Sequence, residues 1–416
     1  MTTTESADVP IEEITFLREL YPRVREDDAA IERYRAALDR LPPIAVARGR
    51  ILVDGFLRWQ AHRRAGRTEI AVEELGNLTD LEIRNESLRR NASHGRQLEI
   101  SDKRRQAGEL YLLGVAESEL VELLSVTPTT LEKYLREAKA TEKQRQKESL
   151  WDRWLNCEWD SYKAAADALS ITDKTVKLWI SEFSDQSEIS EPPASRQRFD
   201  LWNFPMSDSE SSYFGAMPPQ IVENVLWLFT EPGQIVVDPF AGSGTTIDVA
   251  KRRGRRVWAS DRKPSTPLLP IHEHDIVTGW PSPAPKKADL ILLDPPYWKQ
   301  AAGRYSDDAA DLGNMALDAF LAAWASVVKT CVKHLAADGR LAFIASPTDD
   351  KDDHAVHRVV DLPLLMYDAC RQAGLRVVQR IIVPYPTQAA SAPQVEWARK
   401  EKKLLKLYRD LLVMTR

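Results

Sequence analysis

Residues 234–246 read Gln-Ile-Val-Val-Asp-Pro-Phe-Ala-Gly-Ser-Gly-Thr-Thr, and this segment decides how the C-terminal part of the chain folds. The apolar run predicts a buried strand, and Gly242 and Gly244 predict a tight turn that leads into a helix. Backbone N–H groups at such a helix start can contact a bound ligand closely. The spacing fits neither a P-loop, which needs Gly-Lys-Ser/Thr, nor GxGxxG, because Ile247 stands at the third glycine. On the Gly-x-Gly pair alone, a purely structural turn is the alternative.

The sequence after this turn continues as a nucleotide-binding sheet would. A second predicted strand ends at Asp261, about 20 residues past the turn, where a carboxylate commonly binds the hydroxyls of an adenosine ribose. A solvated residue at a strand end is the alternative. From Phe199 onward, short β-branched runs alternate with amphipathic segments, which predicts a doubly wound α/β sheet. Strands are predicted at 235–237, 257–259, 290–293, 341–345 and 377–383, and a helix is predicted from about 318 to 334.

The predicted strand at 290–293 leads into Asp294-Pro-Pro-Tyr297. Two prolines after a buried strand remove N–H donors and fix φ, so the chain turns sharply into a rigid shape. An exocyclic amino group on a base is a poor nucleophile, because its lone pair is delocalised into the ring. A carboxylate and a proline carbonyl that accept its hydrogens would localise that lone pair and stabilise the developing charge. Tyr297 would stack on a base taken out of the helix. A proline turn without a catalytic role is the alternative.

Together, the segments 238–246 and 294–297 resemble two motifs of the DNA amino-methyltransferases, which methylate adenine N6 or cytosine N4 with S-adenosylmethionine. The resemblance implies a Rossmann-like α/β methyltransferase domain over 199–416. It also implies that Asp238 faces the ammonium group of the cofactor and that Asp261 binds its ribose. The residues expected to bind the cofactor are Asp238, Pro239, Phe240, Ala241, Gly242, Ser243, Gly244, Thr245 and Asp261. The residues expected to be catalytic are Asp294, Pro295, Pro296 and Tyr297, and no metal is expected.

Other features of this domain bear on the base and on substrate access. Asp rather than Ser before the two prolines favours adenine N6 over cytosine N4. Carbon-5 methylation of cytosine is not expected, because no cysteine lies near either loop. Residues 218–226 resemble the family's helix beside the cofactor, and residues 380–388 resemble a later strand and loop. Only a helical tail is expected after Gln388. The polar loop at 300–314 either closes over the substrate or is a solvated connection.

The N-terminal residues 51–72 predict a strand, a turn, a basic helix and a strand. A glycine turn at Gly55 with Arg58 in the first helical turn could hold an anion such as phosphate, and a charged surface helix is the alternative. The string resembles the ParB/sulfiredoxin superfamily, and residues 91–98 with 102–105 resemble the next motif of ParB-type proteins. The resemblance implies a small α+β domain and leaves cytidine triphosphate or another nucleotide open as a ligand. Phe56 replaces the cysteine of sulfiredoxins, so their redox activity is not expected.

Residues 97–183 are almost without Gly and Pro and predict an all-α region that contains two helix-turn-helix units. Thr127 with Pro128 is a good cap for the second helix of the first unit, and residues 170–172 connect the two helices of the second unit. Such units read DNA, and plain helical hairpins are the alternative. The residues expected to contact phosphates or base edges are Thr129, Thr130, Lys133, Lys174, Thr175 and Lys177.

Composition bounds these expectations. The 416 residues are 43% hydrophobic and 29% charged, which excludes a wholly disordered chain, and the net charge of −5 requires any DNA affinity to come from local patches. No long apolar run or secretory signal is present, so a cytoplasmic protein is expected. Three separated cysteines argue against a disulfide framework or a zinc cluster. The expected domains are a ParB/sulfiredoxin-like domain at 1–96, a helix-turn-helix region at 97–183, a linker at 184–198 and a methyltransferase domain at 199–416.

Three functions are compatible with these features. The first is a site-specific DNA methyltransferase, of the kind that occurs in restriction–modification, in which residues 1–183 supply most of the contact with double-stranded DNA. Pairing of two chains into a homodimer on a two-fold site fits this function. The second is a ParB-like DNA-binding regulator or clamp with a scaffold methylase domain, which binding of cytidine triphosphate would distinguish. The third is methylation of RNA or of a protein amide.

Overall fold

A computed structural model of the chain describes residues 7–22, 27–93, 98–185, 187–204, 217–264, 269–299, 307–349, 359–385, 391–400, 402 and 404–416. Contacts divide the chain into two compact units, Met1–Gln146 and Lys147–Arg416. The division falls inside helix α6 (Pro128–Leu155), and therefore inside the range expected to form one helical region. Among the described residues, no helix is both long and apolar enough to cross a bilayer.

Unit 1 begins with a small mixed sheet whose strand order is β1-β4-β2-β3. Helix α2 starts directly after Gly55, which has a φ of 96° and lies so close to Ile44 that an added Cβ would be 2.7 Å from its Cγ2. The turn therefore needs glycine, and the strand–turn–helix–strand pattern expected for 51–72 is present. The strands are β1 (Ala7–Pro10), β2 (Ile44–Ala47), β3 (Ile51–Asp54) and β4 (Glu69–Glu74), and the helices are α1 (Asp28–Arg35) and α2 (Phe56–Arg64). Short 3₁₀ turns are η1 (Ile11–Glu13), η2 (Arg18–Leu20), η3 (Leu38–Arg40) and η4 (Arg48–Arg50).

The rest of unit 1 is helical and contains the first predicted helix-turn-helix. Helices α3 (Asp80–Ser93), α4 (Ile100–Leu112), α5 (Glu117–Leu124) and the start of α6 bury a leucine-rich core. Helix α5 ends at Ser125, whose backbone is left-handed. The Thr127 hydroxyl then accepts a hydrogen bond from the Thr130 N–H at 3.2 Å and caps α6. The capping threonine and the helix start at Pro128 were both expected from the sequence.

The second predicted helix-turn-helix lies in the compact unit Lys147–Arg416, and its turn has the same conformation as the first. Helix α7 (Tyr162–Leu169) ends at Ser170, which is again left-handed, and helix α8 (Asp173–Ser184) begins after Thr172. The Thr172 hydroxyl accepts from the Thr175 N–H at 3.1 Å. Trp154, Trp159 and Trp179 are buried between these helices and the end of α6. Helix α9 (Ser187–Ser190) follows.

Unit 2 contains a seven-stranded sheet in the order β12-β13-β9-β8-β5-β6-β7. Strands β9, β8, β5, β6 and β7 run parallel to one another, whereas β13 is antiparallel to both β9 and β12. The strands are β5 (Ile235–Asp238), β6 (Arg256–Asp261), β7 (Ile271–Glu273), β8 (Ala288–Leu293), β9 (Leu335–Ala345), β12 (Arg376–Pro384) and β13 (Tyr408–Thr415). A separate pair is formed by β10 (Thr348–Asp349) and β11 (Val359–Val360). This is the Rossmann-like α/β sheet that the sequence predicted.

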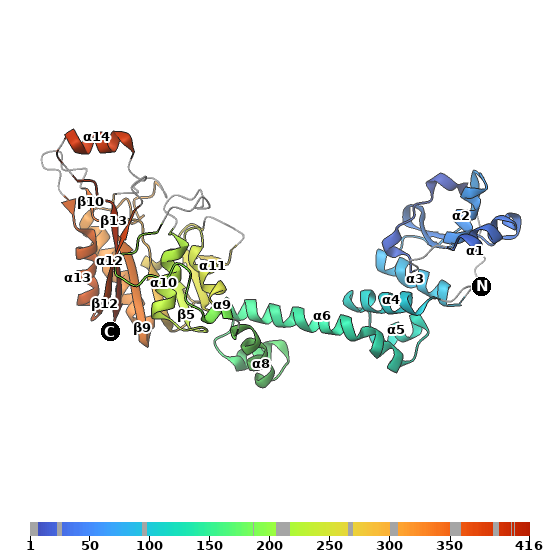
Figure 1. Cartoon of the computed structure of the whole chain (residues 1–416), viewed down its shortest axis with the longest axis horizontal. Coiled ribbons are helices and arrows are strands. Elements are labelled where there is room, and N and C mark those ends of the chain that lie inside the picture. Colours follow the sequence, from blue (N-terminus) through green and yellow to red (C-terminus); the bar gives the residue numbers. More distant parts are fainter. Residues whose placement is uncertain are drawn as a thin grey trace. The chain divides into compact units, whose positions relative to one another are not determined.

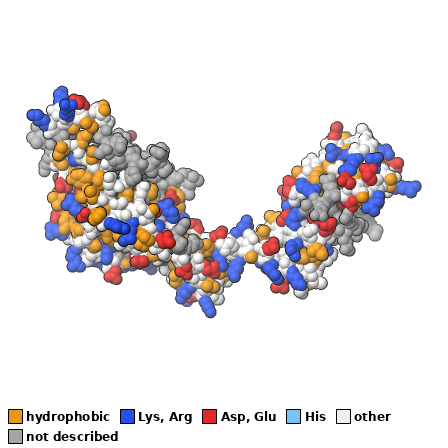
Figure 2. All heavy atoms as spheres, viewed as in Figure 1, with side chains coloured by type: hydrophobic (Ala, Val, Ile, Leu, Met, Phe, Trp, Pro, Cys, Tyr) orange, Lys and Arg blue, Asp and Glu red, His pale blue; other side chains and the backbone are white. Residues whose placement is uncertain are grey.

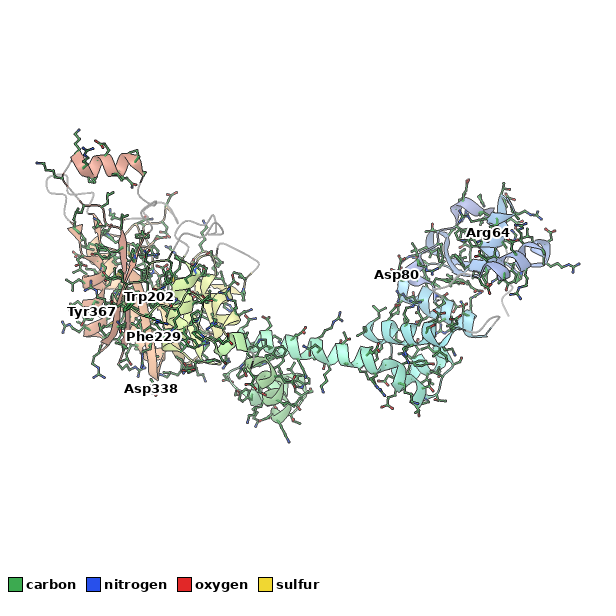
Figure 3. All side chains as sticks on the ribbon, in the orientation of Figure 1. Arg64, Asp80, Trp202, Phe229, Asp338 and Tyr367 are labelled. Carbon is green, nitrogen blue, oxygen red and sulfur yellow. The ribbon has the colours of Figure 1, made fainter. Side chains whose placement is uncertain are left out.

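Helices cover both faces of this sheet (Figure 1). Alternate residues of each strand enter two different apolar cores, because side chains alternate across a sheet. Helices α12 (Leu317–His334) and α13 (Leu362–Gln372) complete one core, and α10 (Pro219–Phe229) and α11 (Thr245–Arg252) complete the other. Trp202, labelled in Figure 3, is buried in the second core, where its indole N–H donates to the Phe199 carbonyl at 3.0 Å. Helix α14 (Ala392–Lys400) and the 3₁₀ turn η5 (Ile276–Thr278) complete the elements.

A helical tail was expected after Gln388, and helix α14 lies there. The prediction is wrong for the last residues, which form strand β13. This strand is buried between β9 and β12, with apolar residues such as Leu411 and Leu412 facing opposite cores. A short run that is apolar on both faces does not alternate, so its periodicity cannot separate a buried strand from a helix. Pairing with β9 and β12 decides the structure instead.

Candidate functional site

The site lies at the carboxyl ends of neighbouring parallel strands. Asp238 ends β5, Asp261 ends β6, and Asp294 follows β8 directly. Chain order reverses at β5, because β6 pairs with one of its edges and β8 with the other. Open α/β sheets bind ligands in the crevice at such a reversal point. The topology therefore brings the expected cofactor-binding and catalytic aspartates to one edge of the sheet.

The loop after β5 is held in shape by backbone hydrogen bonds. The Phe240 N–H donates to Asp238 Oδ1 at 2.9 Å, and the Gly244 N–H donates to the Ala241 carbonyl at 2.7 Å. Gly244 has a φ of 88°, and an added Cβ would lie 2.3 Å from Leu269 Cδ1, so the turn excludes a larger residue. Of the other expected cofactor residues, Pro239 is buried, whereas Phe240, Gly242, Ser243 and Thr245 are half-buried beside the start of α11.

Asp261 ties this loop to the next strand. Its Oδ2 accepts from the Gly242 N–H and its Oδ1 from the Lys263 N–H, both at 2.9 Å. Burial raises the pKa of Asp261, and these two hydrogen bonds oppose the increase. Each carboxylate oxygen has a second lone pair, so the group can still accept hydrogen bonds from a bound diol.

Asp238 is the most buried carboxylate of the site, with 4% of its surface exposed. Burial raises the pKa of Asp238 to about 7, although hydrogen bonds from Thr246 and Phe240 lower it. The charges of Asp294 and Asp261 raise the pKa of Asp238 further. A buried carboxylate without a cationic partner is costly, so the position favours a ligand that carries a positive charge.

Asp294 and Tyr297 are in direct contact. The Tyr297 hydroxyl donates to Asp294 Oδ1 at 3.1 Å. Burial raises the pKa of Asp294 to about 6, while Arg409 and the Tyr297 hydrogen bond lower it. Pro295 is buried and Pro296 half-buried, and the next residue, Trp298, anchors the loop by donating to the Met315 carbonyl at 2.9 Å.

Two further residues of the site were not identified as its members by sequence reasoning. Tyr385 follows β12, in the segment expected to reach the site, and Arg409 lies at the start of β13. Arg409 is 7% exposed, and its guanidinium lies 4.5 Å from the centre of the Tyr385 ring. The signal for Tyr385 was its place in a proline-bracketed loop. Arg409 had no signal, because its strand was predicted as a helix.

An arginine links the far side of the site to the segment after the catalytic loop. Arg262 follows Asp261 and forms ion pairs with Asp275 at 3.5 Å, with Asp311 at 4.0 Å and with Asp308. Residues 307–314 are therefore held against the end of β6. Residues 300–306 of the expected polar loop lie outside the described residues, so this contact concerns only the last part of that loop.

The expected DNA-contacting residues lie on both helix-turn-helix units, and Figure 2 shows basic and acidic side chains interspersed on the face in view. Thr129 and Lys133 of unit 1 are exposed, as is Lys174 of unit 2. Lys177 is exposed and lies 5.6 Å from the Tyr162 ring centre. The hydroxyls of Thr130 and Thr175 each lie 2.9 Å from the capping threonine of their helix, so these two residues also have a structural role.

At the turn expected to bind an anion, Arg58 forms hydrogen bonds within its own domain. Arg58 donates to the carbonyls of Pro42 and Pro43 at 2.9 and 2.7 Å, and to Asp54 at 2.9 Å. These bonds hold α2 against β2 and β3, so the guanidinium has a structural role here. In the ParB-like motif at 91–98, residues 94–97 lie outside the described residues.

Comparisons with known proteins match parts of this chain. Residues 120–265 match a family model described as DNA methylase. The matched range includes the loop after β5 and Asp261, and it ends before Asp294. The chain is 37% identical over 70 residues to the type II methyltransferase M2.DpnII of Streptococcus pneumoniae, which is 16% of this chain and 26% of that protein. It is 27% identical over 104 residues to M.BglII of Bacillus subtilis, covering 24% of this chain and 29% of that protein. The chain thus spans less than a third of the length of these relatives. The match confirms the predicted resemblance to DNA methylases.

Two solved structures are similar to parts of this chain. TrmN of Thermus thermophilus matches with a TM-score of 0.30 and 16% identity, over 49% of this chain and 50% of that chain. The chromosome-partitioning protein ParB of Caulobacter crescentus, complexed with CTP-γ-S, matches with a TM-score of 0.20 and 17% identity, over 42% of this chain and 99% of that chain.

Proposed function

We propose that this chain is a DNA methyltransferase that transfers a methyl group from S-adenosylmethionine to the exocyclic amino group of a flipped base, with adenine N6 favoured over cytosine N4. The observation that carries the proposal is the row of Asp238, Asp261 and Asp294 at the carboxyl ends of β5, β6 and β8, with Tyr297 hydrogen-bonded to Asp294. Adenine is favoured because Asp rather than Ser precedes the two prolines.

The chemistry of the donor set fits the cofactor. Asp238 is a buried carboxylate whose raised pKa favours a positively charged partner, as the ammonium of a methionine group is. Gly242 and Gly244 leave the backbone of the turn open to close approach, and Asp261 has lone pairs for the ribose hydroxyls. When bound, S-adenosylmethionine supplies an electrophilic methyl group.

The residues after β8 prepare the nucleophile. One hydrogen of the amino group donates to the Asp294 carboxylate and the other to the Pro295 carbonyl, so that the nitrogen lone pair points out of the base plane. Asp294 also stabilises the positive charge that develops on nitrogen. Oδ1 of Asp294 already accepts from Tyr297, which leaves Oδ2 for the amino group. The Tyr297 ring stacks on the flipped base and limits its orientations.

DNA contact by the second helix-turn-helix unit is part of this proposal. Arg256, at the start of β6, donates to the Trp154 carbonyl at 3.2 Å and to the Trp159 carbonyl, and it lies 4.0 Å from the Trp154 ring centre. Lys251 of α11 pairs with Asp152 at 2.9 Å. The unit formed by α7 and α8 is thus packed on the same sheet that carries the catalytic loop. A DNA-reading helix in this place would hold the duplex at a constant position relative to Asp294.

Replacing Lys174 and Lys177 together by alanine is expected to weaken DNA binding, because two phosphate contacts are lost. The slope of log affinity against log salt concentration should fall by about 1 for each contact. Fluorescence anisotropy of a labelled duplex at several salt concentrations measures both quantities. The control is Lys329→Ala, an exposed lysine on α12. Unchanged affinity and slope in the double variant would make α7 and α8 a plain helical hairpin.

The proposed activity is tested by incubating the whole chain with labelled S-adenosylmethionine and unmethylated genomic DNA, then digesting the DNA and separating the nucleosides. Label in N6-methyladenine is the expected result. Label in N4-methylcytosine would keep the mechanism and change the base. A bound cofactor without label in any nucleoside would reject DNA methylation and favour a regulator that binds cytidine triphosphate or a substrate other than DNA.

A further inference from the structure

Arg409 is a buried cation for which the described residues supply no carboxylate partner. Within the described part of the chain, no ion pair of Arg409 lies within 4.0 Å, and its buried Nε has no hydrogen-bond partner. The neighbouring Asp410 is nearly fully buried and pairs with Arg380 at 2.7 Å. Burying an unpaired guanidinium costs folding free energy. The presence of Arg409 here therefore points to a role of its charge at the site.

The alternation of β13 directs Arg409 toward the site. Leu411 and Val413 enter the core completed by α10 and α11, whereas Leu412 and Met414 enter the opposite core. Because side chains alternate along a strand, Arg409 lies on the face of Leu411 and Val413. Arg409 pairs in register with Val383, two residues before Tyr385. Antiparallel pairing of β12 and β13 therefore places the guanidinium beside the Tyr385 ring.

A chain of contacts connects Arg409 to the catalytic carboxylate. Its guanidinium lies 4.5 Å from the Tyr385 ring centre, which is within the range of a cation–π interaction. Tyr297 acts on the pKa of Tyr385, so the two side chains lie near each other, and the Tyr297 hydroxyl donates to Asp294 at 3.1 Å. The positive charge of Arg409 lowers the pKa of Asp294, of Tyr297 and of Tyr385, so all three side chains interact electrostatically with the same guanidinium.

We propose that Arg409 is a positioning residue of the methyltransferase site, which holds Tyr385 and Tyr297 against Asp294 and keeps the Asp294 carboxylate ionised when a base displaces water from the site. The inference rests on the proposed function. The groups that face Asp294 are Asp238 from β5, Tyr297 from its own loop, Tyr385 from the end of β12 and Arg409 from β13. Asp238 and the two tyrosines are neutral or negative, so Arg409 supplies the positive charge among these four groups.

Replacing Arg409 by methionine tests this role. We expect the acid limb of the single-turnover rate of methyl transfer, which should lie near pH 6 in the wild type, to move to higher pH by about one unit. The rate at pH 6 should then fall about fivefold, because the ionised fraction of Asp294 drops from about one half to about one tenth, and the rate at pH 8.5 should fall less. Arg409→Lys, which keeps the charge and loses the planar group, should show a smaller shift than Arg409→Met. Cofactor affinity should stay within about twofold, because the ring that Arg409 contacts in the described part of the chain is that of Tyr385, which is not an expected cofactor residue.

The matched control is Arg376→Met, an exposed arginine at the other end of β12 that donates to the backbone carbonyl of Arg416. It should keep the wild-type pH profile. An Arg409→Met enzyme that loses rate equally at every pH would overturn the proposal and leave Arg409 a purely structural residue. Carboxyl NMR of aspartate-labelled protein, with the Asp294 signal assigned by its loss in Asp294→Ala, measures the same shift without catalysis. If the wild type transfers no methyl group, the proposed function fails, and this titration still decides the role of Arg409.

Discussion

Asp294→Ala is expected to lower the rate of methyl transfer by at least about 10²-fold while cofactor affinity stays nearly unchanged. Asp294 follows β8, on the far side of β5 from Asp261, and its described hydrogen-bond partner is Tyr297 of the same loop. Removing the carboxylate takes away an acceptor for the amino hydrogens and the charge that stabilises the developing positive nitrogen. Both effects act on the transition state, so they appear in the rate of the chemical step.

Single-turnover kinetics with saturating cofactor, together with equilibrium dialysis of labelled cofactor, separates these two quantities. The control is Asp338→Ala, an exposed aspartate near the start of β9, labelled in Figure 3. It lies toward the opposite end of the strand from the carboxyl-end edge of the sheet, and its removal should leave both quantities unchanged. A rate of Asp294→Ala within about tenfold of wild type would reject Asp294 as the amino-group acceptor.

The aspartates of the site could be predicted because each follows a short strand in a parallel sheet. The runs before Asp238, Asp261 and Asp294 are apolar or β-branched and are bounded by turn residues, which are strong strand signals. Their mutual position then follows from topology alone, since the carboxyl ends of parallel strands meet at one edge. Local pattern and global fold agree at these residues, and this agreement made the site recognisable.

Arg409 could not be predicted, because its position depends on long-range pairing. Strand β13 returns antiparallel between β9 and β12, and this pairing brings Arg409 beside Tyr385. Its sequence is an apolar run that follows a basic segment, a pattern equally compatible with a helix. The contacts of Arg256 with the carbonyls of Trp154 and Trp159 have the same origin, because they join segments about a hundred residues apart.

Asp238→Asn is expected to weaken cofactor binding by at least about 30-fold at pH 8, the lower end of the effect of breaking a buried charge pair. In the wild type, burial raises the pKa of Asp238 to about 7. The carboxylate must be ionised to face an ammonium group, so binding to the protonated form requires loss of that proton. Wild-type affinity should therefore rise with pH up to about 7, by nearly tenfold per unit below it, and then level off. The asparagine variant should show no such rise, because it has nothing to titrate there.

Equilibrium dialysis of labelled cofactor at pH 5.5, 6.5 and 8 measures this difference, with Asp338→Ala as the control that keeps the wild-type curve. Burial raises the pKa of both Asp238 and Asp261, so the asparagine variant, and not the direction of the pH effect, separates the two carboxylates. The Asp261 carboxylate already accepts two backbone N–H groups, which oppose the rise in its pKa. At Asp238 burial dominates and raises the pKa to about 7. Affinity of Asp238→Asn that still rises between pH 5.5 and 8 would assign the titration to another group and remove Asp238 as the partner of the ammonium.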